Sequence, residues 1–392
     1  MLSPLARALP AMTALQAVVA MGLFALSVLA PQLGLSITQL AGLNTLLFGV
    51  GSVAALLAGR LLRRLGDWSV AALCAASVGA GMACLWAGGP LAPWLAVLLF
   101  GLAFGPETPA SASVLARVTP AARRPWVFSV RQTGNQIGAI AGSLLLPVLL
   151  ALHPRLPYAA VGLLAAMMTL WCLHLSRREE PLARPPAPAA ATDGERGALR
   201  RVLGSPPLRA LAVAALCYTA VQMCLNTFLM SLAVREWRLD VAAAAGWVAW
   251  LQAAGLVGRL FWGRLAMHLR SAARLLGALG LLMAATGVVL MARPVLQTTL
   301  GTTLLVALLG FSASGWNGVL VAEVARIAGP RDAGTLTGTV LMFGYAGLTL
   351  APLAFAGLSA CTSMGTAFML VFAAAAGAAA ALLLAPPGTT TH

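Results

Sequence analysis

Residues 364–385 read MGTAFMLVFAAAAGAAAALLLA, a stretch of 22 residues without a charged side chain. A helix of about 20 apolar residues crosses a hydrocarbon core of ~30 Å, so this stretch is long enough to span a bilayer. Eleven comparable stretches precede it along the chain. They cover residues 10–30, 38–59, 69–87, 93–115, 127–150, 157–176, 208–232, 241–263, 272–291, 297–323 and 334–357. This pattern predicts a multi-pass membrane protein.

The composition supports the same conclusion. Of the 392 residues, 60% are hydrophobic and 9% are charged, with a mean hydropathy of +0.90. Only helices and closed barrels satisfy every backbone hydrogen bond in lipid, and the long apolar runs lack the two-residue alternation of barrel strands. We therefore expect an all-α membrane protein with twelve transmembrane helices in two pseudo-symmetric six-helix bundles.

The basic charge has a membrane explanation. The net charge of +15 comes from 25 arginines and 10 acids, and the arginines cluster at the ends of the apolar spans. A nucleic-acid binder would gather them on one folded face, so that class is excluded. Nineteen arginines fall on one side of the predicted membrane and four on the other. Because basic loops stay in the cytoplasm, we expect both termini to be cytoplasmic and the protein to lie in a bacterial inner membrane.

Several classes of site are missing from the sequence. The six cysteines and four histidines show no metal-ligand spacing, so we expect neither a metal nor a cofactor. Paired carboxylates in mid-span, a Ser/His/Asp set and a phosphate loop are also absent, which argues against an enzyme. The first span resembles a signal peptide in position, but removing it would leave eleven spans, so we expect it to be retained.

The chain divides into two halves that repeat. The one long polar stretch, residues 177–207, predicts a flexible cytoplasmic linker between an N-terminal half at 1–176 and a C-terminal half at 208–392. LeuAlaGlyArgLeuLeu at 57–62 is matched by PheTrpGlyArgLeuAla at 261–266, an offset of 204. Other matches have offsets of up to 209, which indicates a gene duplication.

Twelve spans in two repeated halves, a cytoplasmic linker, and Gly-Arg-Leu at the inner ends of spans two and eight resemble the major facilitator superfamily of secondary transporters. The resemblance covers the whole chain and implies alternating access by a central cavity between the halves. The signature of the family after span two places an aspartate where this chain has Arg63, and Met267 takes the acid position in the second half. Asp67 and Glu323 are candidates to replace the missing acid. The alternative for Glu323 is a solvated charge at the end of its helix, with no role in the gate. The inner gate is predicted to comprise Arg60, Arg64, Asp67, Arg264, Glu323 and Arg326.

Three ionisable residues lie deep within the apolar spans, where a charge is costly and usually lines a water-filled path. Glu107 is near the middle of span four, while Arg131 and Arg259 come from spans five and eight. Two guanidinium groups facing a cavity favour a carboxylate substrate. The segment around Arg259 also resembles span eight of the monocarboxylate and oxalate branches of the superfamily, which implies substrate binding by Arg259. The alternatives are a structural partner for Arg259 and a permanent Glu107–Arg131 salt bridge.

Polar residues at helical spacing suggest further cavity walls. Tyr218, Gln222 and Asn226 recur every four residues on span seven and share one face, although such a stripe also suits helix packing. The remaining substrate-binding candidates are Gln132, Asn135, Gln252 and Asn317. We expect a monomeric transporter, surrounded by lipid, that moves a small organic anion with a proton through Glu107. The alternative is proton-driven export of drugs or other hydrophobic compounds.

Overall fold

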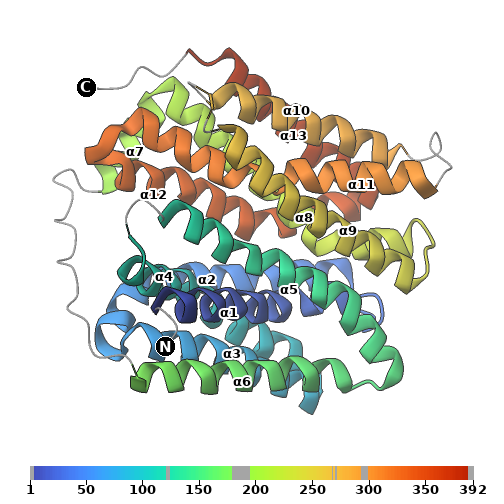
Figure 1. Ribbon diagram of the computed structural model, residues 1–392. Coiled ribbons are helices and arrows are strands. Elements are labelled where there is room, and N and C mark those ends of the chain that lie inside the picture. Colours follow the sequence, from blue (N-terminus) through green and yellow to red (C-terminus); the bar gives the residue numbers. More distant parts are fainter. Residues whose placement is uncertain are drawn as a thin grey trace. The chain divides into compact units, whose positions relative to one another are not determined.

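A computed structural model shows how the chain folds. It describes residues 4–120, 124–178, 195–266, 268–269, 272–292 and 299–386. Within these ranges the regular structure is entirely helical (Figure 1). The first six helices are α1 (Pro4–Leu29), α2 (Ile37–Leu65), α3 (Asp67–Ala87), α4 (Ala92–Val118), α5 (Arg124–Leu152) and α6 (Leu156–Arg178). They are followed by α7 (Glu195–Gly204), α8 (Pro206–Arg235), α9 (Val241–Ala266), α10 (Ala273–Met291), α11 (Thr299–Ala313), α12 (Trp316–Cys361) and α13 (Met364–Leu384).

The predicted number of membrane spans is confirmed. The described part of the chain holds 12 helical segments that are long and apolar enough to cross a bilayer. Two boundaries differ from the prediction. Predicted span ten, at 297–323, is interrupted between α11 and α12, where a side chain on Gly315 would collide with Trp262. Helix α12 then runs on through the gap predicted between spans ten and eleven.

The contacts between Cα atoms divide the chain into two compact units. One contains residues 1–183 and 233–249, and the other contains residues 184–232 and 250–392. The predicted division at a linker over 177–207 stays a prediction. Part of that segment is outside the described residues, and the described part includes the short amphipathic helix α7, which packs on α12.

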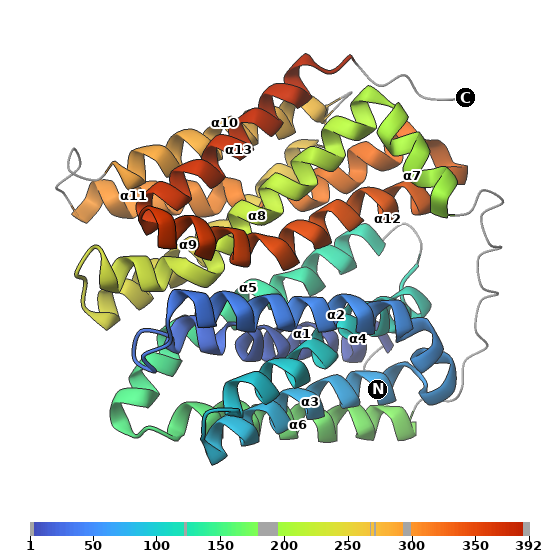
Figure 2. The same ribbon diagram turned by 180° about the vertical axis from the view of Figure 1, so that it is seen from behind.

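Each unit packs its helices in a related way. In the first unit α1 lies against α5, α2 against α4, and α3 against both α4 and α6. In the second unit α10 lies against α11 and α13. Figure 2 shows α3 beside α6 and α10 beside α13, which are the third and sixth spans of their respective halves.

Glycines at repeat-related positions make equivalent close contacts in the two units. A Cβ on Gly138 of α5 would collide with the Ala17 carbonyl of α1, and one on Gly347 of α12 would collide with the Leu216 carbonyl of α8. These two glycines are 209 positions apart, within the offsets of the sequence repeat. Because only glycine allows backbones to approach so closely, each half brings its first and fifth spans together in the same manner.

Candidate substrate and coupling site

A buried ion pair joins α4 to α5 near the middle of the first unit. Arg131 Nη2 lies 2.5 Å from Glu107 Oε1, and the two side chains are 2% and 4% exposed, respectively. Helix α4 continues through Pro106 and Pro109, which lie on either side of Glu107 in the sequence. An isolated charge at this depth would be very costly, and pairing reduces that cost for both groups.

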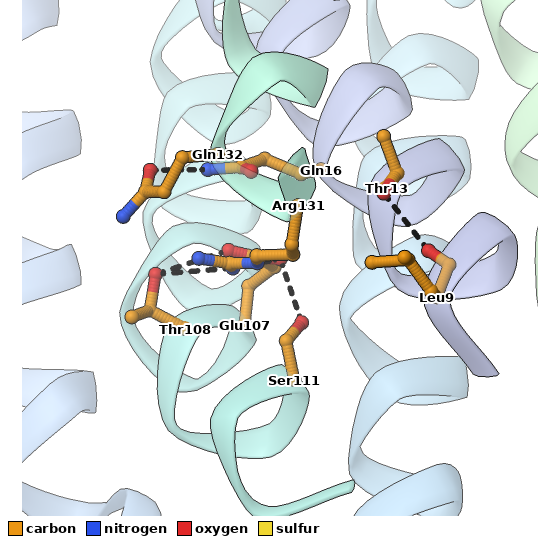
Figure 3. A network of polar contacts seen from close by, with 8 residues as sticks. All are labelled: Leu9, Thr13, Gln16, Glu107, Thr108, Ser111, Arg131 and Gln132. Atoms are coloured by element: carbon orange, nitrogen blue, oxygen red, sulfur yellow. Dashed lines mark hydrogen bonds and ion pairs between the residues drawn. The ribbon is translucent and has the colours of Figure 1, made fainter. Parts of the chain in front are cut away.

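Hydroxyl groups complete the surroundings of the carboxylate (Figure 3). Ser111 Oγ donates to Glu107 Oε1 over 3.0 Å, and Thr108 Oγ1 donates to Oε2 over 3.1 Å. Arg131 Nη2 is also 3.3 Å from Thr108 Oγ1. Arg131 Nε is buried and has no hydrogen-bond partner in the described part of the chain. The guanidinium therefore keeps an unused donor beside a carboxylate whose two oxygens are both occupied.

A glutamine pair extends this polar network to α1. Gln16 Nε2 donates to Gln132 Oε1 over 3.3 Å, so α1 contacts α5 immediately beside Arg131 (Figure 3). The close approach of Gly134 to the Thr13 carbonyl brings the two helices together at this level. Gln16 was missed in the sequence analysis, although a buried amide within an otherwise apolar span was a visible signal. Asn135, predicted as a substrate ligand, is half-buried one turn further along α5.

Two pairs of amide side chains join helices in the described part of the second unit. Asn317 Nδ2 on α12 lies 3.4 Å from Gln222 Oε1 on α8. Gln252 Nε2 on α9 donates to Asn226 Oδ1 on α8 over 2.9 Å. The structure thus brings these four predicted ligands together in pairs, at two levels of α8. Either pair is able to offer amide donors and acceptors to a ligand or simply to join the helices.

Tyr218 has a different environment from the other members of its predicted stripe. It is fully buried, and its hydroxyl donates to the Leu276 carbonyl of α10 over 2.9 Å. Its ring also makes an edge-to-face contact with Trp316 at a centroid distance of 5.8 Å. These contacts lie within the second unit and fit the packing alternative, while the assignment of Tyr218 to substrate binding stays a prediction.

Arg259 is half-buried on α9, two turns after Gln252. On the same helix, Trp262 Nε1 donates to the Phe311 carbonyl of α11 over 2.9 Å. Gly258 lies close to the backbone of Phe311 as well. These contacts fix the orientation of α9 against α11 around the arginine. The assignment of Arg259 to substrate binding stays a prediction.

The two acids predicted for the gate, Asp67 and Glu323, each pair with an arginine of their own unit. Gly66, with φ of +84°, makes the turn that starts α3 at Asp67. The Asp67 carboxylate is buried, pairs with Arg117 of α4 and accepts a hydrogen bond of 2.9 Å from Ser113 Oγ. Arg117 was not predicted as a gate residue, although it precedes Arg326 by 209 positions, an offset of the sequence repeat.

In the second unit the acid comes from a different helix. Glu323 of α12 pairs with Arg326 at 2.8 Å, and its other oxygen accepts a hydrogen bond of 2.9 Å from the Ala272 backbone N–H. Ala272 directly precedes α10, so in both units a carboxylate lies at the start of the third span. A negative charge is favourable there because helix N-termini carry unpaired N–H groups and a positive partial charge. The other gate candidates, Arg60, Arg64 and Arg264, are exposed.

Comparison with known proteins adds the context of a family. The sequence model of the Major Facilitator Superfamily matches residues 10–352. No curated protein matches the sequence. Among solved structures, the chain is similar to a bacterial homologue of the human lysosomal transporter Spinster, in an inward-facing and unoccupied conformation. The identity is 15% and the TM-score 0.73, over 98% of this chain and 96% of that chain.

Two further solved structures have the same fold. One is the peptide transporter POT in complex with sulfate, with 14% identity and a TM-score of 0.75 over 96% of this chain and 94% of that chain. The other is a POT family transporter in complex with 5-aminolevulinic acid, with 11% identity and a TM-score of 0.75 over 96% and 95% of the two chains. At these identities the likeness establishes the fold.

Proposed function

Because this chain belongs to the Major Facilitator Superfamily of membrane transporters, we propose that it carries a small organic anion, a carboxylate, by alternating access and together with a proton. The observation that carries the proposal is the buried Glu107–Arg131 pair, in which the guanidinium has an unused donor at Nε. The same fold accommodates sulfate and 5-aminolevulinic acid in two other transporters.

The coupling follows from competition for one guanidinium. While Glu107 is ionised, it occupies Arg131 and repels an incoming carboxylate. When a proton binds to Glu107, the charge on the carboxyl is removed and its ionic bond to Arg131 is lost. The guanidinium, which remains protonated at physiological pH, is then able to bind the substrate carboxylate through two parallel hydrogen bonds. Proton and anion therefore bind together, and the charge at the pair is again balanced.

Other polar residues are proposed to serve the substrate rather than the proton. Gln132 and Asn135 on α5 lie next to Arg131 and are proposed to bind polar groups of the substrate. In the second unit, the pairs Gln222–Asn317 and Asn226–Gln252 supply neutral amides, while Arg259 supplies a second cation. We propose that these amide side chains turn toward the ligand when it binds. Each of them uses only its N–H or only its C=O group in the contact with its present partner.

Uptake into proteoliposomes tests the proposal. With an inward proton gradient, the wild-type protein should accumulate at least one member of a panel of labelled mono- and dicarboxylates. Arg131→Gln and Arg259→Gln should each reduce this uptake by more than about tenfold, because a charge-assisted bond of more than ~1.4 kcal/mol is lost. Arg274→Gln, which removes an exposed arginine at the start of α10, is the matched control and should transport normally.

The role of the carboxyl is tested separately. Glu107→Gln should still exchange labelled for unlabelled substrate across the membrane, but it should no longer accumulate substrate in response to the proton gradient. Accumulation that survives this substitution would contradict proton coupling through Glu107. If cationic dyes are expelled instead, and the arginine variants transport them normally, the alternative of drug export is correct.

A further inference from the structure

A groove of about 590 Å³ lies between α3 and α6 in the first unit. Glycine and alanine residues from both helices line its middle, namely Gly79 and Ala83 of α3 and Gly162 and Ala166 of α6. Trp86 and Tyr158 line it where α3 ends and α6 begins. Because the central side chains are so small, a narrow apolar groove remains between the two helices although they pack together.

The surfaces beside the groove are those of a lipid-facing wall. Leu73 on α3 and Leu163 and Leu170 on α6 are large, apolar and respectively 46%, 62% and 66% exposed. By contrast, α1 is buried along most of its length. In a protein that spans a bilayer, exposed apolar side chains of this size contact acyl chains, so the groove opens toward lipid.

One end of the groove is at the level of the lipid headgroups. Asp67 starts α3 and Trp86 is 19 residues further on, which corresponds to ~28 Å at 1.5 Å per residue, about the thickness of the hydrocarbon core. Tryptophan favours this boundary region. The exposed Arg155, in the connection between α5 and α6, holds its guanidinium carbon 5.7 Å from the centroid of the Trp86 ring. A permanent cation is thus held at the mouth of an apolar groove.

We propose that this groove binds an anionic phospholipid, with one acyl chain along α3 and α6 and the headgroup phosphate on Arg155. The charge and the shape of the site are both needed for this occupant. The guanidinium forms paired, charge-assisted hydrogen bonds with a phosphate, and the glycine and alanine lining leaves room for a linear hydrocarbon chain. This binding site is separate from the Glu107–Arg131 pair and does not depend on the transported substrate.

Native mass spectrometry of the delipidated protein, with added phosphatidylglycerol or phosphatidylcholine of identical acyl chains, tests the headgroup contact. Wild-type protein should bind phosphatidylglycerol about fivefold or more tightly than phosphatidylcholine, because only the former has a net negative charge for Arg155. Arg155→Gln should abolish this preference and Arg155→Lys should keep most of it. Arg177→Gln removes an exposed arginine at the other end of α6 and should have no effect. Equal binding of the two lipids by wild type, or an unchanged preference in Arg155→Gln, would overturn the proposal.

A second pair of variants tests the acyl chain. Ala166→Leu places a larger side chain in the groove and should weaken the binding of both lipids several-fold. Ala80→Leu adds the same side chain to an exposed position on α3 that does not line the groove, so it should bind both lipids as wild type does. Binding that Ala166→Leu leaves unchanged would mean that the headgroup alone is bound, and the groove would have no role. Melting temperatures equal to that of wild type will show that the variants are folded.

Discussion

Arg131 of α5 and Glu107 of α4 form a buried ion pair in which Nη2 and Oε1 are 2.5 Å apart. The charge of this guanidinium is therefore balanced from within the protein. An anionic substrate must either compete with Glu107 or arrive when Glu107 has taken up a proton. The same contact also holds α4 and α5 together. A purely structural pair and a coupling pair predict different transport by the variant in which both residues are replaced.

The stability of the fold should depend on both partners of this pair. Arg131→Gln and Glu107→Gln should each destabilise the protein by ~3–5 kcal/mol, because each leaves one buried charge unpaired. The double variant has no buried charge at this site and should be more stable than either single variant. Thermal unfolding in detergent measures this coupling as a double-mutant cycle. If the double variant also regains accumulation of substrate, the pair is purely structural and the coupling proposal is wrong.

Close packing of α1 on α5 should make Gly138 intolerant of even a methyl group. Gly138→Ala would place Cβ against the Ala17 carbonyl and should cost ~1–3 kcal/mol, as overpacking does. Gly142→Ala is the control, since its Cβ would meet ordinary contacts at 3.8 and 3.9 Å. Melting temperatures of the two variants give the comparison.

The repeat predicts the same result in the second half of the chain. Gly347→Ala would collide with the Leu216 carbonyl, whereas Gly357→Ala has open space around the added methyl group. Only Gly347→Ala should lower the melting temperature. Equal melting temperatures for these two variants would show that α8 and α12 do not depend on the close contact seen at Gly347.

The two carboxylates predicted for the inner gate, Asp67 and Glu323, should differ in their importance for stability. Asp67 is 1% exposed and Arg117 is 17% exposed, whereas Arg326, the partner of Glu323, is 29% exposed. Solvent screens the second pair more strongly. We therefore expect Asp67→Asn to destabilise by ~3 kcal/mol and Glu323→Gln by about 1 kcal/mol, since glutamine is still able to accept the Ala272 N–H. Thermal unfolding at low and high salt checks this order, and equal losses for the two variants would show that screening does not distinguish the pairs.

Cys361 offers a direct test of the predicted membrane orientation. It is the exposed member of the six cysteines, at the end of α12, and the predicted topology places it on the outer side of the membrane. A membrane-impermeant maleimide should therefore label the protein in spheroplasts, and Cys361→Ser should remove most of this label. Labelling that requires inside-out vesicles would place the termini outside.

The twelve spans, the helical fold and the family were predictable from sequence because lipid leaves the backbone few alternatives. Runs of about 20 apolar residues must form helices there, and their number and arginine-rich ends follow directly from the order of residues. The repeat between residues 57–62 and 261–266 likewise needs no coordinates. For the same reason, charges as isolated as Glu107 and Arg131 stood out as candidates.

Contacts between residues distant in the sequence were not predictable in the same way. The four-residue spacing of Tyr218, Gln222 and Asn226 correctly placed them along α8, but their partners come from three other helices, and Tyr218 bonds to the α10 backbone. Gln16 joins the network only because glycine lets α1 approach α5. Whether Glu107 was solvated or paired with Arg131 depended on the rotation and separation of α4 and α5. Hydropathy is a property of each segment, whereas hydrogen bonds and ion pairs depend on distances of a few ångströms, which the packing of the helices sets.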